Sequence, residues 1–290
     1  MPELHALATY YRGALWVAEA QGRVVGMIAC RPDHDEAGVW EICRVYVHPD
    51  WHGAGLGHAL LDVAEAHTIA AGARRLTLWT DTRFERAHAF YEKRSYIRAG
   101  GIRVLHDLSN SLEYGYAKPV DGVEVLDAAA STAAERRLAL ILVACVEAGA
   151  SVSFLPPLAA ERARPFWHKA ASEVANGTRI LLAGWRRGIL SGCVSLDLAM
   201  PENQPHRAEV QKLLVHPDAR RGGLAHALML RAEEAARSAG RTLLTLDTRA
   251  DDVAAALYHS TGWTEAGQIP RYALDAGRTP RATSLFWKLL

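Results

Sequence analysis

The sequence predicts an α/β protein made of two tandem domains, each with a mixed sheet of the α+β kind. The first reason is a repeated phrase: "HPDWHGAGLGHALL" begins at His48 and "HPDARRGGLAHALM" begins 168 positions later, at His216. A spacing this wide indicates two copies of a whole domain rather than a solenoid repeat. The second reason is that strand-like and helix-like segments alternate in both copies. The third is length, because 290 residues suffice for about two domains of ordinary size.

Composition excludes several classes of protein. Half of the residues are hydrophobic, which is typical of folded cores and not of disordered chains. Lys and Arg number 33 against 32 for Asp and Glu, so no basic field predicts a nucleic-acid partner. The longest apolar run, at 138–146, is far shorter than the ~20 residues of a membrane span. We therefore expect neither nucleic acid nor membrane as a partner.

Localisation is predicted from the start of the chain and from its cysteines. The first residues, "MPELHALATYYRG", lack the basic-then-apolar order of a secretory signal. The four cysteines (Cys30, Cys43, Cys145 and Cys193) are scattered and are best interpreted as thiols in a reducing cytoplasm. We therefore expect a cytoplasmic protein.

Each copy begins with the same local pattern. An apolar, β-rich segment ("WEICRVYVH" and "AEVQKLLVH") runs into a proline and a glycine-rich turn, and a helical pattern follows. The apolar positions recur at helical spacing. In the first copy they are Leu56, Leu60, Val63, Ala64 and His67, and in the second Leu224, Leu228, Ala232 and Ala235. Gly72 and Gly240 are expected to end these helices.

The segments downstream also match. A short strand is predicted at 74–81 ("RRLTLWTD") and again at 241–248 ("RTLLTLDT"). A helix carrying Tyr91 or Tyr258 follows, and then further strands that end in "YGYAKPV" and "LFWKLL". The junction is expected near Pro119-Val-Asp-Gly122, which gives domains at 1–119 and 122–290.

The two copies differ in front of the repeated phrase. The second has room for a strand at "VEVLDA", helices at 131–148 and 158–175, and two strands within 178–198. The first has only 47 residues before His48, enough for one short helix and two strands at about 15–23 and 24–31. The first copy is therefore expected to lack its opening strand and helix.

The glycine-rich turn predicts an anion site. Where a strand turns through glycines into a helix, unpaired N–H groups and the positive end of the helix dipole face the same space. Phosphate or pyrophosphate is the natural ligand of such a cradle, although a turn of this kind can also serve only to join two elements. The candidate residues are His52, Gly53, Ala54, Gly55, Leu56 and Gly57 in the first copy, and Arg220, Arg221, Gly222, Gly223, Leu224 and Ala225 in the second. Arg220 and Arg221 could add charge-assisted contacts.

Neither common nucleotide motif is present in the loop. It has no G-K-[ST], as a Walker loop has, and no G-x-G-x-x-G. The segment "VHPDARRGGLAHAL" instead resembles motif A (Q/R-x-x-G-x-G/A) of the GNAT superfamily of acetyl-CoA-dependent N-acetyltransferases, at Arg220, Gly223 and Ala225. "ALYHSTGW" resembles the family's helix-Tyr-Gly-aromatic element. The C-terminal half resembles the branch that includes tabtoxin-resistance acetyltransferases. The first copy departs from the motif at His52.

The resemblance implies a mixed sheet with an opened centre that takes the pantetheine arm of acetyl-CoA. Backbone groups just before the loop would bond this arm, from Leu213 and Val215 in the second copy and from Val45 and Val47 in the first. The loop amides would hold the pyrophosphate. No His/Cys cluster has metal-ligand spacing, so no metal is expected.

Acetyl transfer to an amine needs a base and an acid. An alkyl amine with a pKa of about 10.4 is protonated at pH 7, and neutralising it costs roughly 4.6 kcal/mol. The resemblance places the general base at Glu209, with Glu41 as its counterpart, and the acid that protonates the leaving thiolate at Tyr258, with Tyr91 as its counterpart. Each could instead be an ordinary strand or core residue. Asp247, His259 and His106 are further candidates for an acceptor pocket, although surface or capping roles are the simpler interpretation.

The function predicted is acetyl transfer to the amine of a small molecule such as an antibiotic, a toxin or an amino-acid-like compound. A protein-lysine or N-terminal acetyltransferase is the nearest alternative, and a non-catalytic acetyl-CoA sensor is the alternative of another class. The C-terminal copy is expected to carry the main activity because it has both front helices, which in this family wall the acceptor pocket. A second chain could supply the wall that the first copy lacks, so a homodimer is also considered.

Overall fold

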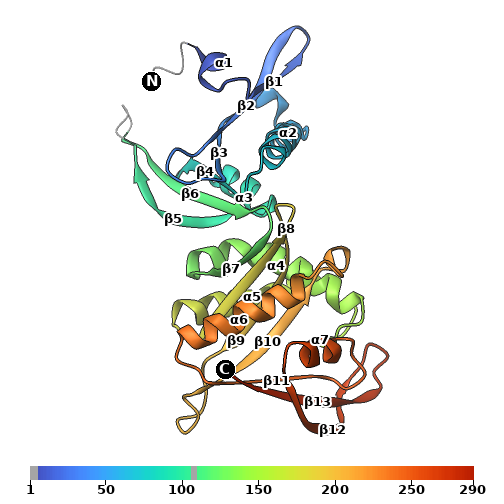
Figure 1. Ribbon diagram of the computed structural model, residues 1–290. Coiled ribbons are helices and arrows are strands. Elements are labelled where there is room, and N and C mark those ends of the chain that lie inside the picture. The colour runs from blue at the N-terminus through green and yellow to red at the C-terminus, as the bar shows by residue number, and fades with distance from the viewer. Residues whose placement is uncertain (1–5, 106–109) are drawn as a thin grey trace. The chain divides into compact units, whose positions relative to one another are not determined.

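The computed structural model describes residues 6–105 and 110–290. The chain divides into two compact units. The first, here called the N-terminal unit, comprises Met1–Tyr91 and Tyr96–Val120, and the second, here called the C-terminal unit, comprises Glu92–Ser95 and Asp121–Leu290. Each unit is built around its own mixed sheet (Figure 1). The predicted fold class, two tandem α/β domains, is confirmed.

The N-terminal unit is a six-stranded sheet with the strand order β1-β2-β3-β4-β6-β5. Among the strands described in this unit, only β3 and β4 pair in parallel. Its elements are α1 (Leu7–Tyr10), β1 (Leu15–Ala20), β2 (Arg23–Pro32), β3 (Val39–Val47), the 3₁₀ helix η2 (Pro49–Trp51), α2 (Leu56–Ala70), β4 (Arg75–Asp81), α3 (Glu85–Lys93), β5 (Ile97–Val104) and β6 (Leu112–Pro119).

The C-terminal unit is a seven-stranded sheet with the order β12-β13-β11-β10-β9-β8-β7. Strands β10 and β11 form its parallel pair. Its elements are β7 (Gly122–Leu126), α4 (Ala128–Glu147), α5 (Ala160–Ala175), β8 (Arg179–Arg186), β9 (Ile189–Asp197), β10 (Arg207–Val215), the 3₁₀ helix η3 (Pro217–Ala219), α6 (Leu224–Ser238), β11 (Leu243–Arg249), α7 (Ala254–Ser260), β12 (Thr264–Leu274) and β13 (Pro280–Leu289).

The two sheets share one strand order. Strands β8, β9, β10, β11, β13 and β12 follow one another as β1, β2, β3, β4, β6 and β5 do, and β7 is an extra edge strand. Before β1, the described part of the N-terminal unit, which starts at residue 6, holds one helical turn, α1, in place of β7, α4 and α5. The prediction that the first copy lacks its opening strand and helix is confirmed.

Helices α2 and α6 pack on their sheets with most of the predicted faces. Leu60 and Ala64 in α2, and Leu224, Leu228 and Ala232 in α6, are buried. The prediction was wrong for Val63, which is 45% exposed, and for His67, which is also exposed. The buried stripe of α2 follows Leu60, Leu61, Ala64 and Thr68 instead. In α6, Ala235 is only partly buried, at the edge of the stripe.

A buried ion pair joins each of these helices to a late strand of its sheet. In the N-terminal unit, Lys118 Nζ donates to Glu65 Oε1 over 2.8 Å, and the Tyr96 hydroxyl donates to the same oxygen over 3.1 Å. In the C-terminal unit, Lys288 Nζ donates to Glu233 Oε1 over 2.7 Å. The pair therefore recurs at matching places in the two copies.

Removing Lys118 alone is expected to destabilise the N-terminal unit. The Lys118 side chain is 2% exposed and that of Glu65 12% exposed, so Lys118→Met leaves a buried carboxylate without its lysine. Breaking a buried pair on one side costs about 3–5 kcal/mol. Hydrogen exchange of α2 and β6 in the full chain should accelerate accordingly. The double variant Glu65→Gln/Lys118→Met should recover part of the protection, since no charge is then buried. Unchanged exchange in Lys118→Met would contradict this assignment.

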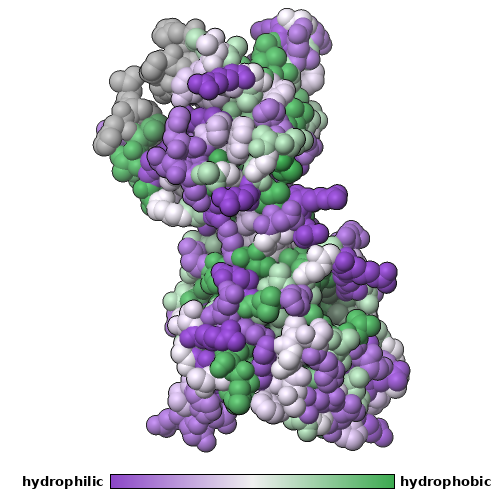
Figure 2. All heavy atoms as spheres, in the orientation of Figure 1, coloured by the Kyte–Doolittle hydropathy of each residue, from purple (hydrophilic) through white to green (hydrophobic). Residues whose placement is uncertain are grey.

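Within residues 6–105 and 110–290, no helix is long and apolar enough to cross a bilayer. Hydrophilic side chains cover much of the visible surface of each unit, and hydrophobic residues form smaller groups between them (Figure 2).

Candidate functional site

The repeated phrase folds in the same way in both units. His48 and His216 each cap a single 3₁₀ turn, and the imidazole Nδ1 accepts the N–H of Asp50 or Asp218. Gly55 and Gly223 are the N-cap residues of α2 and α6, with φ of 81° and 80°, in the left-handed region where glycine carries no steric penalty. The same histidine cap and glycine N-cap thus lead each strand into its helix.

Open space lies in front of the two glycine loops. A Cβ added at Gly53, Gly55 or Gly223 would meet no atom within 4 Å. The first N–H groups of a helix have no partners inside the helix and point outward at this end. The loops therefore have the form of an anion cradle, with room for a ligand against the backbone. The side chain of Leu224 points away from it into the core, so Leu224 can contribute only its backbone.

The first loop residue ties the loop to the end of the preceding strand. Arg220 Nε donates to the Val215 carbonyl over 3.2 Å, and His52 Nε2 lies 3.0 Å from the Val47 carbonyl. His52 thus takes the place of arginine in a bond within the loop. Cys145 Sγ also lies 3.3 Å from the Val215 carbonyl. Because both strand-end carbonyls have these partners, a ligand would meet other backbone groups of Val47 and Val215.

The parallel strands of each unit pair only at their beginnings. The β10–β11 pairing runs from Arg207↔Leu243 to Glu209↔Thr245, and the β3–β4 pairing ends at Ile42↔Leu78. Beyond these points β10 and β3 each contain a bulge. Its residues include Lys212 and Leu213 in β10, and Arg44 and Val45 in β3. Each sheet therefore opens on the side that leads to its glycine loop.

Two carboxylates and a lysine gather where β10 leaves β11. Glu209 occupies the last paired position of β10, opposite Thr245 of β11. Asp247 lies two residues beyond Thr245, so Glu209, Thr245 and Asp247 are on one face of the sheet. Gln211 Nε2 donates to Glu209 Oε1 over 3.1 Å, and a guanidinium nitrogen of Arg207 lies 3.9 Å from Glu209 Oε2.

Two of these groups have pKa values shifted by their surroundings. Asp247 is exposed, but desolvation by the protein around its carboxyl and then the neighbouring Glu209 carboxylate raise its pKa above the usual range. Burial and then Arg179 lower the pKa of the Lys212 ammonium, while Asp247 and Glu209 act in the opposite direction. Lys212 Nζ also lies 3.3 Å from Ser153 Oγ. The opening of the C-terminal sheet is thus lined by coupled acid and base groups.

The matching face of the N-terminal unit is held by ion pairs and tyrosines. Both Nε and a terminal nitrogen of Arg31 donate to Glu41 Oε2, at 2.9 and 2.5 Å. Arg31 also donates to the Tyr10 hydroxyl, and Arg44, the bulge residue that matches Lys212, donates to the buried Tyr11 hydroxyl. Glu41 would have to leave its ion pair in order to act as a base.

The candidate acids, Tyr91 and Tyr258, are each 6% exposed in α3 and α7. Burial raises the pKa of both hydroxyls, so both stay protonated at neutral pH. Nearby Asp252 and Asp247 add to the effect at Tyr258. The Tyr258 ring packs against Phe286, with centroids 5.4 Å apart.

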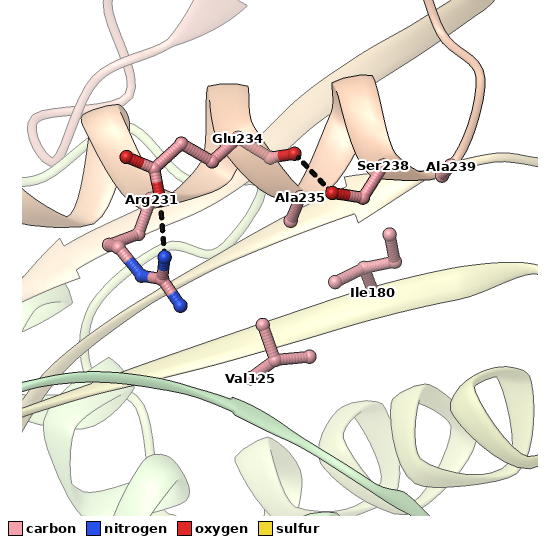
Figure 3. A pocket seen from close by; sticks show the side chains of 7 residues that line it. All are labelled: Val125, Ile180, Arg231, Glu234, Ala235, Ser238 and Ala239. Atoms are coloured by element: carbon pink, nitrogen blue, oxygen red, sulfur yellow. Dashed lines mark hydrogen bonds and ion pairs between the residues drawn. The ribbon is translucent and has the colours of Figure 1, made fainter.

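One cavity lies on the C-terminal unit, away from these groups. It measures about 420 Å³ and is formed by the C-terminal half of α6, β7 and β8, as Figure 3 shows. Its lining is Val125, Ile180, Arg231, Glu234, Ala235, Ser238 and Ala239. Arg231 and Glu234 pair with each other there, which leaves an apolar floor and no reactive group.

A second, polar cavity of about 310 Å³ lies near the carboxylate cluster. It is lined by Ala148, Gly149, Arg249, Asp251, Asp275, Ala276, Gly277 and Arg281. Arg249, two residues after Asp247 on β11, donates to the Gly149 carbonyl over 3.2 Å and pairs with Asp251. Arg281 donates to Asp275 over 2.7 Å. Each acid of this cavity is therefore neutralised by an arginine.

The sequence indicates Asp247 only as a candidate for an acceptor pocket, with a surface or capping role as the simpler interpretation, and it does not single out Lys212 or Arg186. Asp247 gains its interest from the β10–β11 register, which brings it near Glu209. The alternation of "LTLDTR" indicates only that Asp247 shares a face with Thr245. His259 lies 3.9 Å from Glu265 and 5.2 Å from the Phe286 ring centroid. His106 lies outside the described residues. In the parts of the chain that are described, no group of three or more His, Cys, Asp or Glu side chains could hold a metal ion.

A model of the acetyltransferase (GNAT) family matches residues 1–96 and 150–263. The chain is 32% identical over 82 residues to an uncharacterised N-acetyltransferase of Methanocaldococcus jannaschii. It is 40% identical over 86 residues to the aminoglycoside N(6')-acetyltransferase type 1 of Stenotrophomonas maltophilia. Each match covers 27% of this chain, and the matches span 36% and 55% of the respective relatives.

The fold is also found among solved structures. An acetyltransferase structure from Salmonella typhimurium, determined with its cofactor acetyl-CoA, superposes with a TM-score of 0.50 at 18% identity. The match covers 59% of this chain and 94% of that one. One such domain therefore spans little more than half of the chain.

Proposed function

The chain belongs to the acetyltransferase (GNAT) family, and from this we propose that it transfers the acetyl group of acetyl-CoA to a primary amine of a small molecule. We assign the main activity to the C-terminal unit. The observation that carries the proposal is the opening between β10 and β11, which has Glu209 and Asp247 at its start and the glycine loop of α6 at its far end.

The residues around this opening fit acetyl-CoA. The open space at Gly223 and the N-terminus of α6 suit a pyrophosphate, with Arg220, Arg221, Gly222 and Ala225 beside it. Leu213, in the bulge, and the N–H of Val215 would bond the pantetheine arm. When bound, acetyl-CoA supplies the thioester carbonyl that the amine attacks. The acetyl-CoA in the Salmonella typhimurium protein supports this choice of co-substrate.

Glu209 and Asp247 would remove the proton of the amine. Desolvation by the surrounding protein and then the Glu209 carboxylate raise the pKa of Asp247, so Asp247 can hold a proton at a higher pH than an isolated aspartate. This raises the basicity of Asp247 toward that of the amine. Tyr258, protonated at neutral pH, would donate to the thiolate that leaves. Direct attack then needs only these groups of the chain.

The acceptor is proposed to enter through the polar cavity beside Arg249 and Gly149. A cavity of about 310 Å³ is suited to a small molecule or part of one. The relative that is 40% identical is an aminoglycoside acetyltransferase by name, which supports a small-molecule amine as the acceptor class. The arginine–aspartate pairs in the cavity would offer both donors and acceptors to a polar molecule.

The N-terminal unit is assigned a secondary role in coenzyme binding. It keeps a glycine cradle at 53–57, with Val45 and Val47 at the end of its strand. Its candidate base, Glu41, is paired with Arg31, and Tyr91 would be its acid. The closed network on this face favours binding without efficient turnover.

The pH profile of kcat/KM should reflect the raised pKa of Asp247. Because burial and Glu209 raise the pKa of Asp247, activity should fall as the pH drops through a range above that of an ordinary aspartate. In Asp247→Asn this acid limb should move to lower pH, with a lower plateau rate. Glu209→Gln is the matched comparison on the facing strand. A profile of Asp247→Asn that superposes on the wild type would remove Asp247 from the mechanism.

Release of free thiol from acetyl-CoA, measured with a panel of small amines and lysine peptides, tests the proposed reaction. The proposal predicts release that depends on a small amine. Release only with peptides would favour a protein acetyltransferase. Coenzyme binding without release for any amine would favour a sensor.

A further inference from the structure

We infer that Arg186, at the end of β8, is a further phosphate-contacting residue of the C-terminal loop and one that the N-terminal unit lacks. The inference rests on the proposed function, because its ligand is the phosphate groups of the coenzyme. It deepens that proposal by giving the two cradles different affinities.

Gly222 provides the first observation. Its backbone is outside the left-handed region, so conformation does not require glycine at this position. A Cβ added there would lie 3.0 Å from a terminal nitrogen of Arg186 and 3.4 Å from Nε and Cζ. The guanidinium therefore lies against the loop backbone at Gly222, one residue before the N-cap of α6. Glycine makes room for this close approach.

The second observation is that both residues change together between the two units. Arg186 is the last residue of β8, before a turn in which Arg187 and Gly188 have φ of 50° and 71°. Ala20 is the last residue of β1, before a turn in which Gln21 and Gly22 have φ of 52° and 72°. The N-terminal residue that matches Gly222 is Ala54. Where the guanidinium is absent, a Cβ is accommodated in the loop.

The third observation concerns Arg221, which has a φ of 61° where the N-terminal unit has Gly53 at 84°. Arginine is uncommon in this region, and strained residues that persist cluster at functional sites. The C-terminal loop therefore has a cationic residue at a left-handed position that glycine would adopt without steric penalty. Arg220, Arg221 and Arg186 are thus in the C-terminal loop or beside it, whereas His52, Gly53 and Ala20 occupy the matching positions of the N-terminal unit.

Asp121 orients Arg186 without blocking it. Asp121 Oδ1 lies 3.5 Å from a guanidinium nitrogen of Arg186 and accepts the Arg187 N–H over 3.2 Å. The Arg186 and Asp121 side chains are 46% and 50% exposed, so their attraction is weak. A guanidinium has five N–H donors, which leaves donors for a phosphate at Gly222. Charge-assisted bonds of this kind are about twice as strong as neutral ones.

Titration calorimetry of the full chain with coenzyme A tests the inference. All variants carry Gly55→Asp, so that the N-terminal loop does not contribute. Arg186→Gln is expected to weaken binding roughly tenfold and to reduce its salt dependence. Gly222→Ala should weaken binding to a similar extent, because its Cβ displaces the guanidinium. The double variant should bind no more weakly than either single variant, since both changes remove one contact. Arg187→Gln, on the same turn, is the charge-matched control and should bind like the parent.

A parallel titration with dephospho-coenzyme A identifies the phosphate. A tenfold effect of Arg186→Gln that persists assigns the contact to the pyrophosphate, and an effect that vanishes assigns it to the 3'-phosphate. Parent-like binding by Arg186→Gln, or fully additive losses in the double variant, would overturn the inference and leave the proposed function intact. Failure of the Gly55→Asp parent to bind coenzyme A would instead overturn the coenzyme site of the C-terminal unit, and the inference with it.

Discussion

Gly223→Asp is expected to abolish coenzyme binding by the C-terminal unit. A Cβ at this position would meet open space, so the new side chain would enter the cradle itself. Its carboxylate would face the pyrophosphate, and two like charges about 4 Å apart repel by roughly 4 kcal/mol at an effective dielectric constant of 20. At 1.4 kcal/mol per tenfold, the loss should exceed about 100-fold.

Gly223→Ala is the matched control for this substitution. It imposes the same left-handed backbone, with a φ of 80°, on a residue with a Cβ but adds no charge. Calorimetry should therefore place its affinity between those of the wild type and Gly223→Asp. Equal affinities of all three proteins, with the N-terminal loop disabled by Gly55→Asp, would show that the α6 loop does not bind the coenzyme.

Tyr258→Phe is expected to lower kcat by roughly 10²–10⁴, the usual contribution of a positioned proton donor. Burial raises the pKa of the Tyr258 hydroxyl, which therefore carries its proton throughout the neutral range. Phenylalanine keeps the ring contacts with Trp263 and Phe286 and removes only the hydroxyl. Coenzyme affinity, measured by calorimetry, should remain within about twofold because no binding contact is changed. A wild-type kcat in Tyr258→Phe would make Tyr258 a packing residue.

The repeated phrase was enough to predict the tandem fold and the unequal front ends. Each of its signals acts within a few residues: the proline after the strand, the glycine at the helix N-cap and the helical spacing of Leu224, Leu228 and Ala232. Local chemistry of this kind is readable in a sequence because neighbours along the chain determine it.

The surroundings of the candidate site could not be predicted in the same way. Asp247 interacts with Glu209 through the register of two strands, and Arg186 reaches Gly222 from a turn 36 positions earlier. The ion pair of Glu41 with Arg31 likewise depends on how β2 and β3 align. Tertiary packing sets these contacts. The assignments of Glu209, Tyr258 and the loop residues therefore stay predictions until they are tested by substitution.

The C-terminal unit is expected to perform the acetyl transfer. Steady-state thiol release by two single variants, Gly55→Asp and Gly223→Asp, tests this with an accepted amine and an acetyl-CoA concentration that just saturates the wild type. We expect Gly55→Asp to retain most of the wild-type rate and Gly223→Asp to lose it. Loss of turnover in Gly55→Asp with full turnover in Gly223→Asp would contradict this expectation and place the activity in the N-terminal unit.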